Sequence, residues 1–217
     1  MFSGLFFTKI CARAIKRHEW GRIMQHIVAL AEELCNFLSA LPEVKRCELY
    51  GSLSRGNYDL YSDIDIMVDV SGTDNSRFVT RLPQIFAQRY NVIFYDYAAS
   101  LAPDLYVVTL AVDGDNPFRV VDINCTATPH CPGLSQAQAA ALCSPYAHAL
   151  KMLSVYLKQL LRGQDAHGGI VNLYTPLLGQ PRAGAGDMNM LREIYGWVKE
   201  HAETRHEGLV RSFAQFL

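Results

Sequence analysis

Two carboxylates separated by a single residue are the feature of this chain with the clearest chemical meaning. Asp63 and Asp65 lie in the segment 62–70, where polar and apolar residues alternate, and this alternation predicts a β-strand. Side chains of a strand point to opposite faces in turn, so both aspartates share one face while the apolar residues can enter a core. Two adjacent carboxylates repel each other, and a hard cation such as Mg²⁺ keeps both ionised. The pattern therefore predicts a divalent-metal site.

A glycine-serine turn precedes the two aspartates. Gly51 and Ser52 follow the strand-like segment 44–50. Gly51 lacks a Cβ and allows a close backbone approach, and Ser52 offers a hydroxyl and an amide at the start of a predicted short helix. Such a turn suits an anionic phosphate. Arg55 could neutralise charge there, although solvation explains an exposed turn arginine equally well.

A third carboxylate is expected, because two-metal phosphoryl-transfer sites commonly take ligands from more than one strand. The turn sequence 113–117 lies between the strand-like segments 105–112 and 118–125 and predicts a hairpin whose second strand carries Asp122. The alternative for Asp122 is a buried structural acid that needs a partner. Asp113 and Asp115 are interpreted as turn formers, because Asp bonds its own backbone in loops rich in glycine and proline.

Gly51-Ser52, the spacer 53–62 and Asp63-Ile64-Asp65 together resemble the signature of the nucleotidyltransferase superfamily that includes DNA polymerase β. The resemblance covers roughly residues 19–125. Arg55-Gly56 and Ser62 stand where members of the superfamily's small bacterial branch tend to have such residues. The resemblance implies an α+β fold, with a mixed-sheet polymerase β-like nucleotidyltransferase domain followed by an α-helical domain, and it places the third aspartate on a strand like that of Asp122. The alternative is a surface hairpin with two solvated aspartates.

The rest of the sequence predicts a chain of two domains. Helical and strand-like segments alternate up to about residue 125, as expected of helices packed on a sheet. After Ser135 the pattern is helical, and Ser144-Pro145 predicts the cap and first turn of a new helix. We place a boundary near Pro132-Gly133, with a nucleotidyltransferase domain at 1–133 and a helical domain at 134–217. The expected helices are 20–41, 76–90, 136–162 (as two helices) and 188–202, with a strand at 91–97.

Composition narrows the class of protein. The chain has 217 residues, half of them hydrophobic, and a formal charge of −1, so a sizeable core is feasible and no general basic surface for nucleic acid is present. The densest basic cluster, Lys16-Arg17-His18, fits a solvated helix face, so a nucleic-acid partner is not expected. Six cysteines without any Cys-x-x-Cys point to a reduced, cytoplasmic protein. The apolar opening 1–7 lacks the features of a signal peptide, and no run reaches membrane-spanning length.

The resemblance implies transfer of a nucleoside monophosphate from a Mg²⁺-bound nucleoside triphosphate, with ATP expected, to a hydroxyl of a small molecule. The bacterial lincosamide and aminoglycoside antibiotic nucleotidyltransferases are similar in plan. An antitoxin-like protein that adenylylates or binds a partner toxin is the alternative, and a homodimer is left open. The implied catalytic residues and metal ligands are Asp63, Asp65 and Asp122, and the nucleotide-binding residues are Gly51, Ser52, Arg55 and Lys151.

Four residues of the helical part are further candidates. Lys151 and Lys158 are spaced to share one helix face, so they could contact the triphosphate, although an ordinary solvated face is the simpler interpretation. His148 and Glu193 are alternative general bases. No feature of the sequence singles out either of them.

Overall fold

The structure is a computed structural model that describes residues 17–98 and 102–217, with side chains from Gln25 onward. The apolar opening 1–7, Cys11 and Lys16 lie outside the described residues. The side chains of Arg17 and His18, the rest of the predicted basic cluster, are outside them as well.

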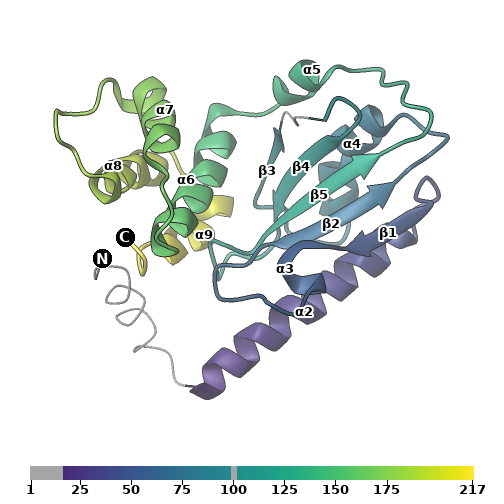
Figure 1. Ribbon diagram of the computed structural model, residues 1–217, viewed down its shortest axis with the longest axis horizontal. Coiled ribbons are helices and arrows are strands. Elements are labelled where there is room, and N and C mark those ends of the chain that lie inside the picture. Colours follow the sequence, from purple (N-terminus) through teal and green to yellow (C-terminus); the bar gives the residue numbers. More distant parts are fainter. Residues whose placement is uncertain (1–16, 99–101) are drawn as a thin grey trace.

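A five-stranded mixed sheet with the order β1-β2-β5-β4-β3 forms the centre of the described structure (Figure 1). Its neighbours β2 and β5 run parallel, whereas β1 with β2, β3 with β4, and β4 with β5 run antiparallel. This arrangement confirms the predicted α+β class. The strands are β1 (Arg46–Leu49), β2 (Ile64–Asp69), β3 (Phe94–Ala98), β4 (Tyr106–Ala111) and β5 (Val120–Thr126).

One face of the sheet packs against the helices α2 (Arg17–Ser39) and α4 (Asn75–Ala87). On β2, Ile64 and the next two alternate residues are completely buried in this core, as the alternation in the sequence predicts. The N-cap residue of α4 is Asp74, whose carboxylate accepts from the amides of residues 76 and 77 and so satisfies donors that the first turn leaves free. The apolar side of the sheet is therefore closed, and its polar side faces the helical part.

The second half of the chain is helical and contributes to a second core. The helix α6 (Pro145–Leu161) begins as predicted, because the Ser144 hydroxyl accepts from the amide of Ala147. Helical residues of this core pack with Phe94, Val120 and neighbouring sheet residues. The remaining elements of this half are α5 (Gln136–Ala140), α7 (His167–Leu178), α8 (Asp187–Glu200), η1 (Thr204–His206) and α9 (Glu207–Phe213).

The predicted boundary at residue 133 falls in the connection between β5 and α5. The second core spans this boundary, since it contains residues from both sides. The two parts are thus joined by shared burial as well as by the chain. Within residues 17–98 and 102–217, no helix combines the length and the apolar character that crossing a membrane requires.

Candidate active site

Three aspartates converge on one small volume at the polar face of the sheet. Asp65 on β2 and Asp122 on β5 are direct partners in the parallel register, and Asp63 lies one residue before β2. One carboxylate oxygen from each of the three lies within 4.8 Å of the other two. Among the described residues, this is the only such group of acids, histidines or cysteines. The structure therefore brings together the three acids that the sequence singles out.

The acids belong to a row of polar residues that crosses the sheet. Asp122 is paired with Thr109 on β4, and Thr109 is paired with Asp96 on β3. Residues directly opposite each other on neighbouring strands share a face, so the row Asp65, Asp122, Thr109, Asp96 lines one surface. The Thr109 hydroxyl donates to the Asp122 carboxylate. The sequence gives no signal for Thr109 or Asp96, because the row exists only once the strands are in register.

Negative charge is crowded in this cluster. Burial, followed by the charges of Asp63 and Asp122, raises the pKa of Asp65 to about 6, while Lys158 and Arg55 oppose the shift. Burial also raises the pKa of Asp122, against the hydrogen bond from Thr109 and the charge of Lys151. A further positive charge nearby would stabilise the ionised form of both carboxyls.

The turn at Gly51 is fitted closely around Asp65. Gly51 begins the short helix α3 (Gly51–Ser54) with φ +69°, a left-handed conformation that favours glycine. A Cβ placed on Gly51 would lie 1.9 Å from Oδ2 of Asp65, so no side chain fits there. The Ser52 hydroxyl is buried and has no hydrogen-bond partner among the described residues. An unpaired buried hydroxyl is costly, and a phosphate oxygen beside the turn would satisfy it.

Two lysines of α6 reach the polar row. Lys158 forms an ion pair with Asp63, and the two side chains are 16% and 19% exposed. The Nζ atom of Lys151 lies 3.4 Å from Oδ2 of Asp96, with side chains that are 11% and 2% exposed. The interpretation of these lysines as an ordinary solvated face is therefore wrong: both are largely buried and paired with acids.

The other candidate residues are placed as follows. Arg55 is the exposed C-cap residue of α3. The Nδ1 atom of His148 lies 3.2 Å from Oδ2 of Asp96, at the far end of the polar row from Asp65. Glu193 accepts a hydrogen bond from the Tyr174 hydroxyl, so its described contact is with α7 rather than with the three aspartates.

The turn between β4 and β5 has a structural role, as predicted. Oδ1 of Asp113 accepts from the amide of Asp115 at 2.9 Å. Oδ2 of Asp113 pairs with the guanidinium of Arg119 at 2.6 Å, and both side chains are about nine-tenths buried. The carboxylate of Asp113 is thus occupied within the hairpin.

Comparison with known proteins agrees with the interpretation of residues 51–65 as a nucleotidyltransferase motif. Residues 29–113 match the family described as nucleotidyltransferase domain. The matched range includes Gly51, Ser52, Asp63 and Asp65 and ends before Asp122. No curated protein matches the chain.

Several solved structures are similar at low identity. Cid1, described with RNA terminal uridylyl transferase activity, is 18% identical over 90% of this chain and 53% of its own, with a TM-score of 0.35. GLD-2 in its complex with RNP-8 is 13% identical over 89% of this chain and 56% of its own, with a TM-score of 0.37. This chain therefore spans little more than half the length of these relatives, and TM-scores of this size do not establish a common arrangement of the whole chains.

Proposed function

Because residues 29–113 match the nucleotidyltransferase domain family, we propose that the chain transfers a nucleoside monophosphate from a nucleoside triphosphate, preferably ATP, to a hydroxyl of a small acceptor. The observation that carries the proposal is the convergence of Asp63, Asp65 and Asp122 within 4.8 Å. The tight turn at Gly51 and the unpaired hydroxyl of Ser52 support a phosphate beside these acids.

The residues present fit a divalent cation. Carboxylate oxygens are the hard ligands that Mg²⁺ prefers, and a cation would favour the ionised form of Asp65, whose pKa is raised by burial and by the charges of Asp63 and Asp122. We propose that Asp63, Asp65 and Asp122 hold Mg²⁺. When bound, the ion would neutralise charge on the triphosphate and stabilise the charge that develops during transfer.

The transfer itself is an in-line displacement. The acceptor oxygen forms a bond to the α-phosphorus, the bond to the pyrophosphate oxygen breaks, and the acceptor hydroxyl loses its proton. Asp122 is the best placed base, because the Thr109 hydroxyl fixes the orientation of its carboxylate. A base must lie within hydrogen-bonding reach of the proton that it removes, so Asp122 acts on an acceptor seated against β5.

Cationic side chains would hold the phosphates. Lys158 contacts Asp63, and we propose that its ammonium moves to a phosphate oxygen when the triphosphate binds. Ser52 donates its free hydroxyl, and Arg55, which is exposed beside the same turn, balances the remaining charge. Lys151 is already paired with Asp96 and is the second cation of the site.

A small acceptor is preferred because Lys158 and Arg55 are assigned to the triphosphate, and the other described cations beside the site are paired with acids. Lys158, Lys151 and Arg162 each pair with an acid, the last with Asp59 at 2.7 Å. Binding of a polynucleotide depends on cations that are free to neutralise phosphates. A hydroxylated antibiotic requires no such surface.

The test is a pyrophosphate-release assay with the four nucleoside triphosphates, Mg²⁺ and a panel of hydroxylated antibiotics. Asp63→Asn and Asp65→Asn should abolish release while the fold is retained, since neither side chain belongs to an apolar core. Asp115→Asn is the matched control, because Asp115 is an exposed turn acid, and it should behave like the wild type. Near wild-type turnover of Asp63→Asn would contradict the proposal that Asp63 is a metal ligand. Transfer to a purified partner protein, with none to small molecules, would favour the antitoxin-like alternative.

A further inference from the structure

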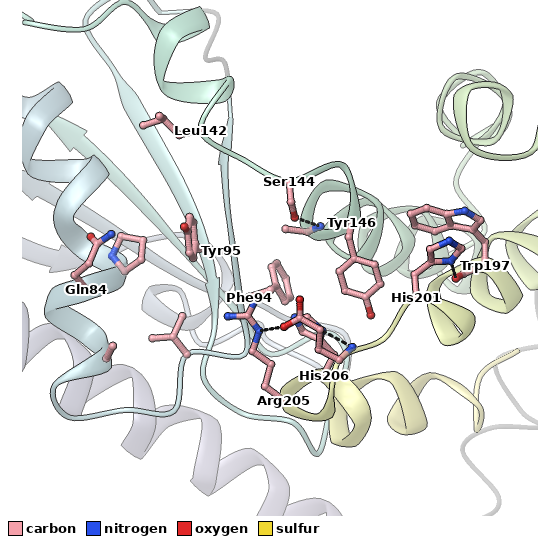
Figure 2. Close-up of a pocket in the computed structure, with 15 residues that line it drawn as sticks. Gln84, Phe94, Tyr95, Leu142, Ser144, Tyr146, Trp197, His201, Arg205 and His206 are labelled. Carbon is pink, nitrogen blue, oxygen red and sulfur yellow. Dashed lines mark hydrogen bonds and ion pairs between the residues drawn. The ribbon is translucent and has the colours of Figure 1, made fainter.

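A cavity of about 660 Å³ lies at the edge of the sheet formed by β3 (Figure 2). One wall comes from β3 and the end of α4, and the other comes from the start of α6, the end of α8 and η1. Its volume is typical of small-molecule sites, which range from roughly 300 to 1,000 Å³. A cavity of this kind can hold a ligand of its own.

The cavity is separate from the three aspartates. Its described lining residues include none of these acids and neither Lys151 nor Lys158. Tyr146, in the cavity wall, precedes Lys158 by twelve residues on α6, which corresponds to about 18 Å along the helix. A ligand in this cavity is therefore not the triphosphate held at Asp63.

Aromatic rings form much of the inner wall. The rings of Trp197 and His201 stack with their centroids 4.3 Å apart and an interplanar angle of 22°. The Tyr146 ring lies 4.7 Å from that of His206 and 6.1 Å from that of Trp197. At the rim, Leu142 is 55% exposed. Flat aromatic surfaces favour a flat aromatic ligand, through stacked or edge-to-face contacts.

The polar groups of the cavity specify the ligand further. The Tyr146 hydroxyl is buried and has no hydrogen-bond partner among the described residues. Burial, and then the charge of Glu203, raises the pKa of Tyr146 to about 12, so the hydroxyl stays protonated and can donate. A ligand with an acceptor atom at its edge would satisfy this donor.

The charges in the cavity cancel. Glu203 and Arg205 pair with each other at 3.0 Å, and burial lowers the pKa of His206, which favours its neutral form. A phosphate group would find no unpaired Lys or Arg among the described lining residues. The ligand should therefore be uncharged.

We propose that this cavity is a second binding site, for a neutral, flat heteroaromatic molecule that accepts a hydrogen bond from Tyr146. The proposal does not rest on the transferase activity. Such a molecule could be a free nucleoside or a heteroaromatic compound without a sugar, and both share the chemistry that the cavity recognises.

The test is a calorimetric titration of the full chain in EDTA with adenosine, uridine, caffeine and, as a non-aromatic control, cyclohexanol. We expect saturable binding of at least one heteroaromatic probe, unchanged at high salt, and none of cyclohexanol. Tighter binding of the nucleosides would identify a nucleoside site, and tighter binding of caffeine a site for bases without a sugar. No saturable binding of any heteroaromatic probe, up to its solubility limit, would overturn the proposal.

Two variants locate the binding. Ala87→Trp places a large ring in the cavity from an exposed position at the end of α4 and should abolish binding. Tyr146→Phe removes only the unpaired hydroxyl and should weaken binding about five- to tenfold. Tyr156→Phe, at an α6 tyrosine that is not among the described lining residues, is the matched control and should bind like the wild type. Probe binding that neither Ala87→Trp nor Tyr146→Phe alters would place the ligand elsewhere.

A further titration, with ATP, tests whether the cavity recognises a charged ligand. ATP without metal should bind this cavity no more tightly than adenosine does, in the wild type and in Asp65→Asn alike. Tighter binding of ATP that is weakened by salt and lost in Ala87→Trp would show that the cavity recognises phosphate, and the proposal of a neutral ligand would fail. Because this assay contains no metal and measures no transfer, its result is independent of the outcome of the pyrophosphate assay.

Discussion

At the level of single residues, Gly51 offers a direct test of how closely the turn is fitted to Asp65. Gly51 and Gly56 both have φ +69°, but only Gly51 lacks room for a Cβ, while nothing lies within 4 Å of a Cβ at Gly56. Either alanine substitution should cost about 1–2 kcal/mol of backbone strain. Gly51→Ala should also displace Asp65 and lower kcat/KM about a hundredfold or more, as misplacements near 1 Å can do.

Thermal melts and steady-state kinetics of both variants would separate the two effects. Gly56→Ala should lose stability and keep its turnover per folded molecule. Equal losses of kcat/KM in the two variants would show that the contact between residue 51 and Asp65 has no part in catalysis.

The ionisation of Asp65 predicts a pH-dependent stability. The folded pKa of about 6 lies above the ordinary value of 3.8, so the folded state binds this proton more tightly than the unfolded state does. The stability from this group is complete below the ordinary pKa and is lost as pH rises towards 6. In EDTA, Asp65→Asn should therefore melt a few degrees above the wild type at pH 8, where 1 kcal/mol corresponds to about 2–4 °C.

The difference in melting temperature should shrink to nothing near pH 4, where Asp65 is protonated. Mg²⁺ at pH 8 should narrow it as well, because the cation stabilises only the wild-type carboxylate cluster. A variant that melts below the wild type at pH 8 in EDTA would contradict the charge crowding at this site.

At the level of elements, two ion pairs join the end of α6 to the segment that carries the aspartates. Lys158 pairs with Asp63, and Arg162 pairs with Asp59 at 2.7 Å one turn later. Asp59 in turn accepts from the amide of Tyr61 and from the hydroxyl of Ser62. The end of α6 therefore holds the loop that leads into β2.

Lys158→Ala should raise the affinity of the free protein for a divalent cation, because the ammonium no longer competes at Asp63. The same variant should raise the KM for the triphosphate, because a phosphate contact is lost. Titration with Mn²⁺, followed by electron paramagnetic resonance, measures the first effect without catalysis. Lys199→Ala, at an exposed lysine of α8, is the control. Weaker Mn²⁺ binding in Lys158→Ala than in Lys199→Ala would count against competition at Asp63.

The elements also show what the sequence can and cannot predict. The alternation around Asp63 and the cap at Ser144 are local signals, and both are confirmed. The helix α7 is not predicted, because Gly168, Gly169 and Pro176 lower its helical propensity. In the structure it packs against α6 and α8.

Contacts between residues that are far apart in the sequence cannot be predicted from local sequence patterns. The contact of Lys158 with Asp63 joins residues 95 positions apart. The row from Asp65 to Asp96 depends on the register of four strands. Sequence patterns identify the acids of the site and name its lysines as candidates, whereas the acids that pair with those lysines and the supporting Thr109 require the three-dimensional arrangement.

At the level of the whole molecule, the sheet is enclosed by two cores of different origin. The first core joins α2 and α4 to one face, and it consists mostly of residues before position 128. The second core is built from the helical half but includes Phe94, Ala111, Phe118 and Val120 of the sheet half. These four side chains are almost completely buried and depend on the helical half for their cover.

Deletion of 134–217 should therefore leave a fragment, 1–133, that does not behave as an independent domain. The removed part also carries Lys151 and Lys158, so the acids at Asp63 and Asp96 lose their partners. An unpaired buried charge and an exposed apolar face both destabilise a fold. We expect the fragment to aggregate or to bind a hydrophobic dye strongly, whereas the full chain should unfold in one cooperative transition.

Size-exclusion chromatography, dye fluorescence and thermal unfolding would measure these properties. Leu150→Ala in the full chain is the matched milder change, because it removes one completely buried side chain of the second core. It should cost about 2–5 kcal/mol and should lower the melting temperature of the sheet and of the helices together, since one core joins them. A monomeric fragment 1–133 that unfolds cooperatively would falsify the dependence of the sheet on the helical half, and it would identify residue 133 as the boundary of an autonomous domain.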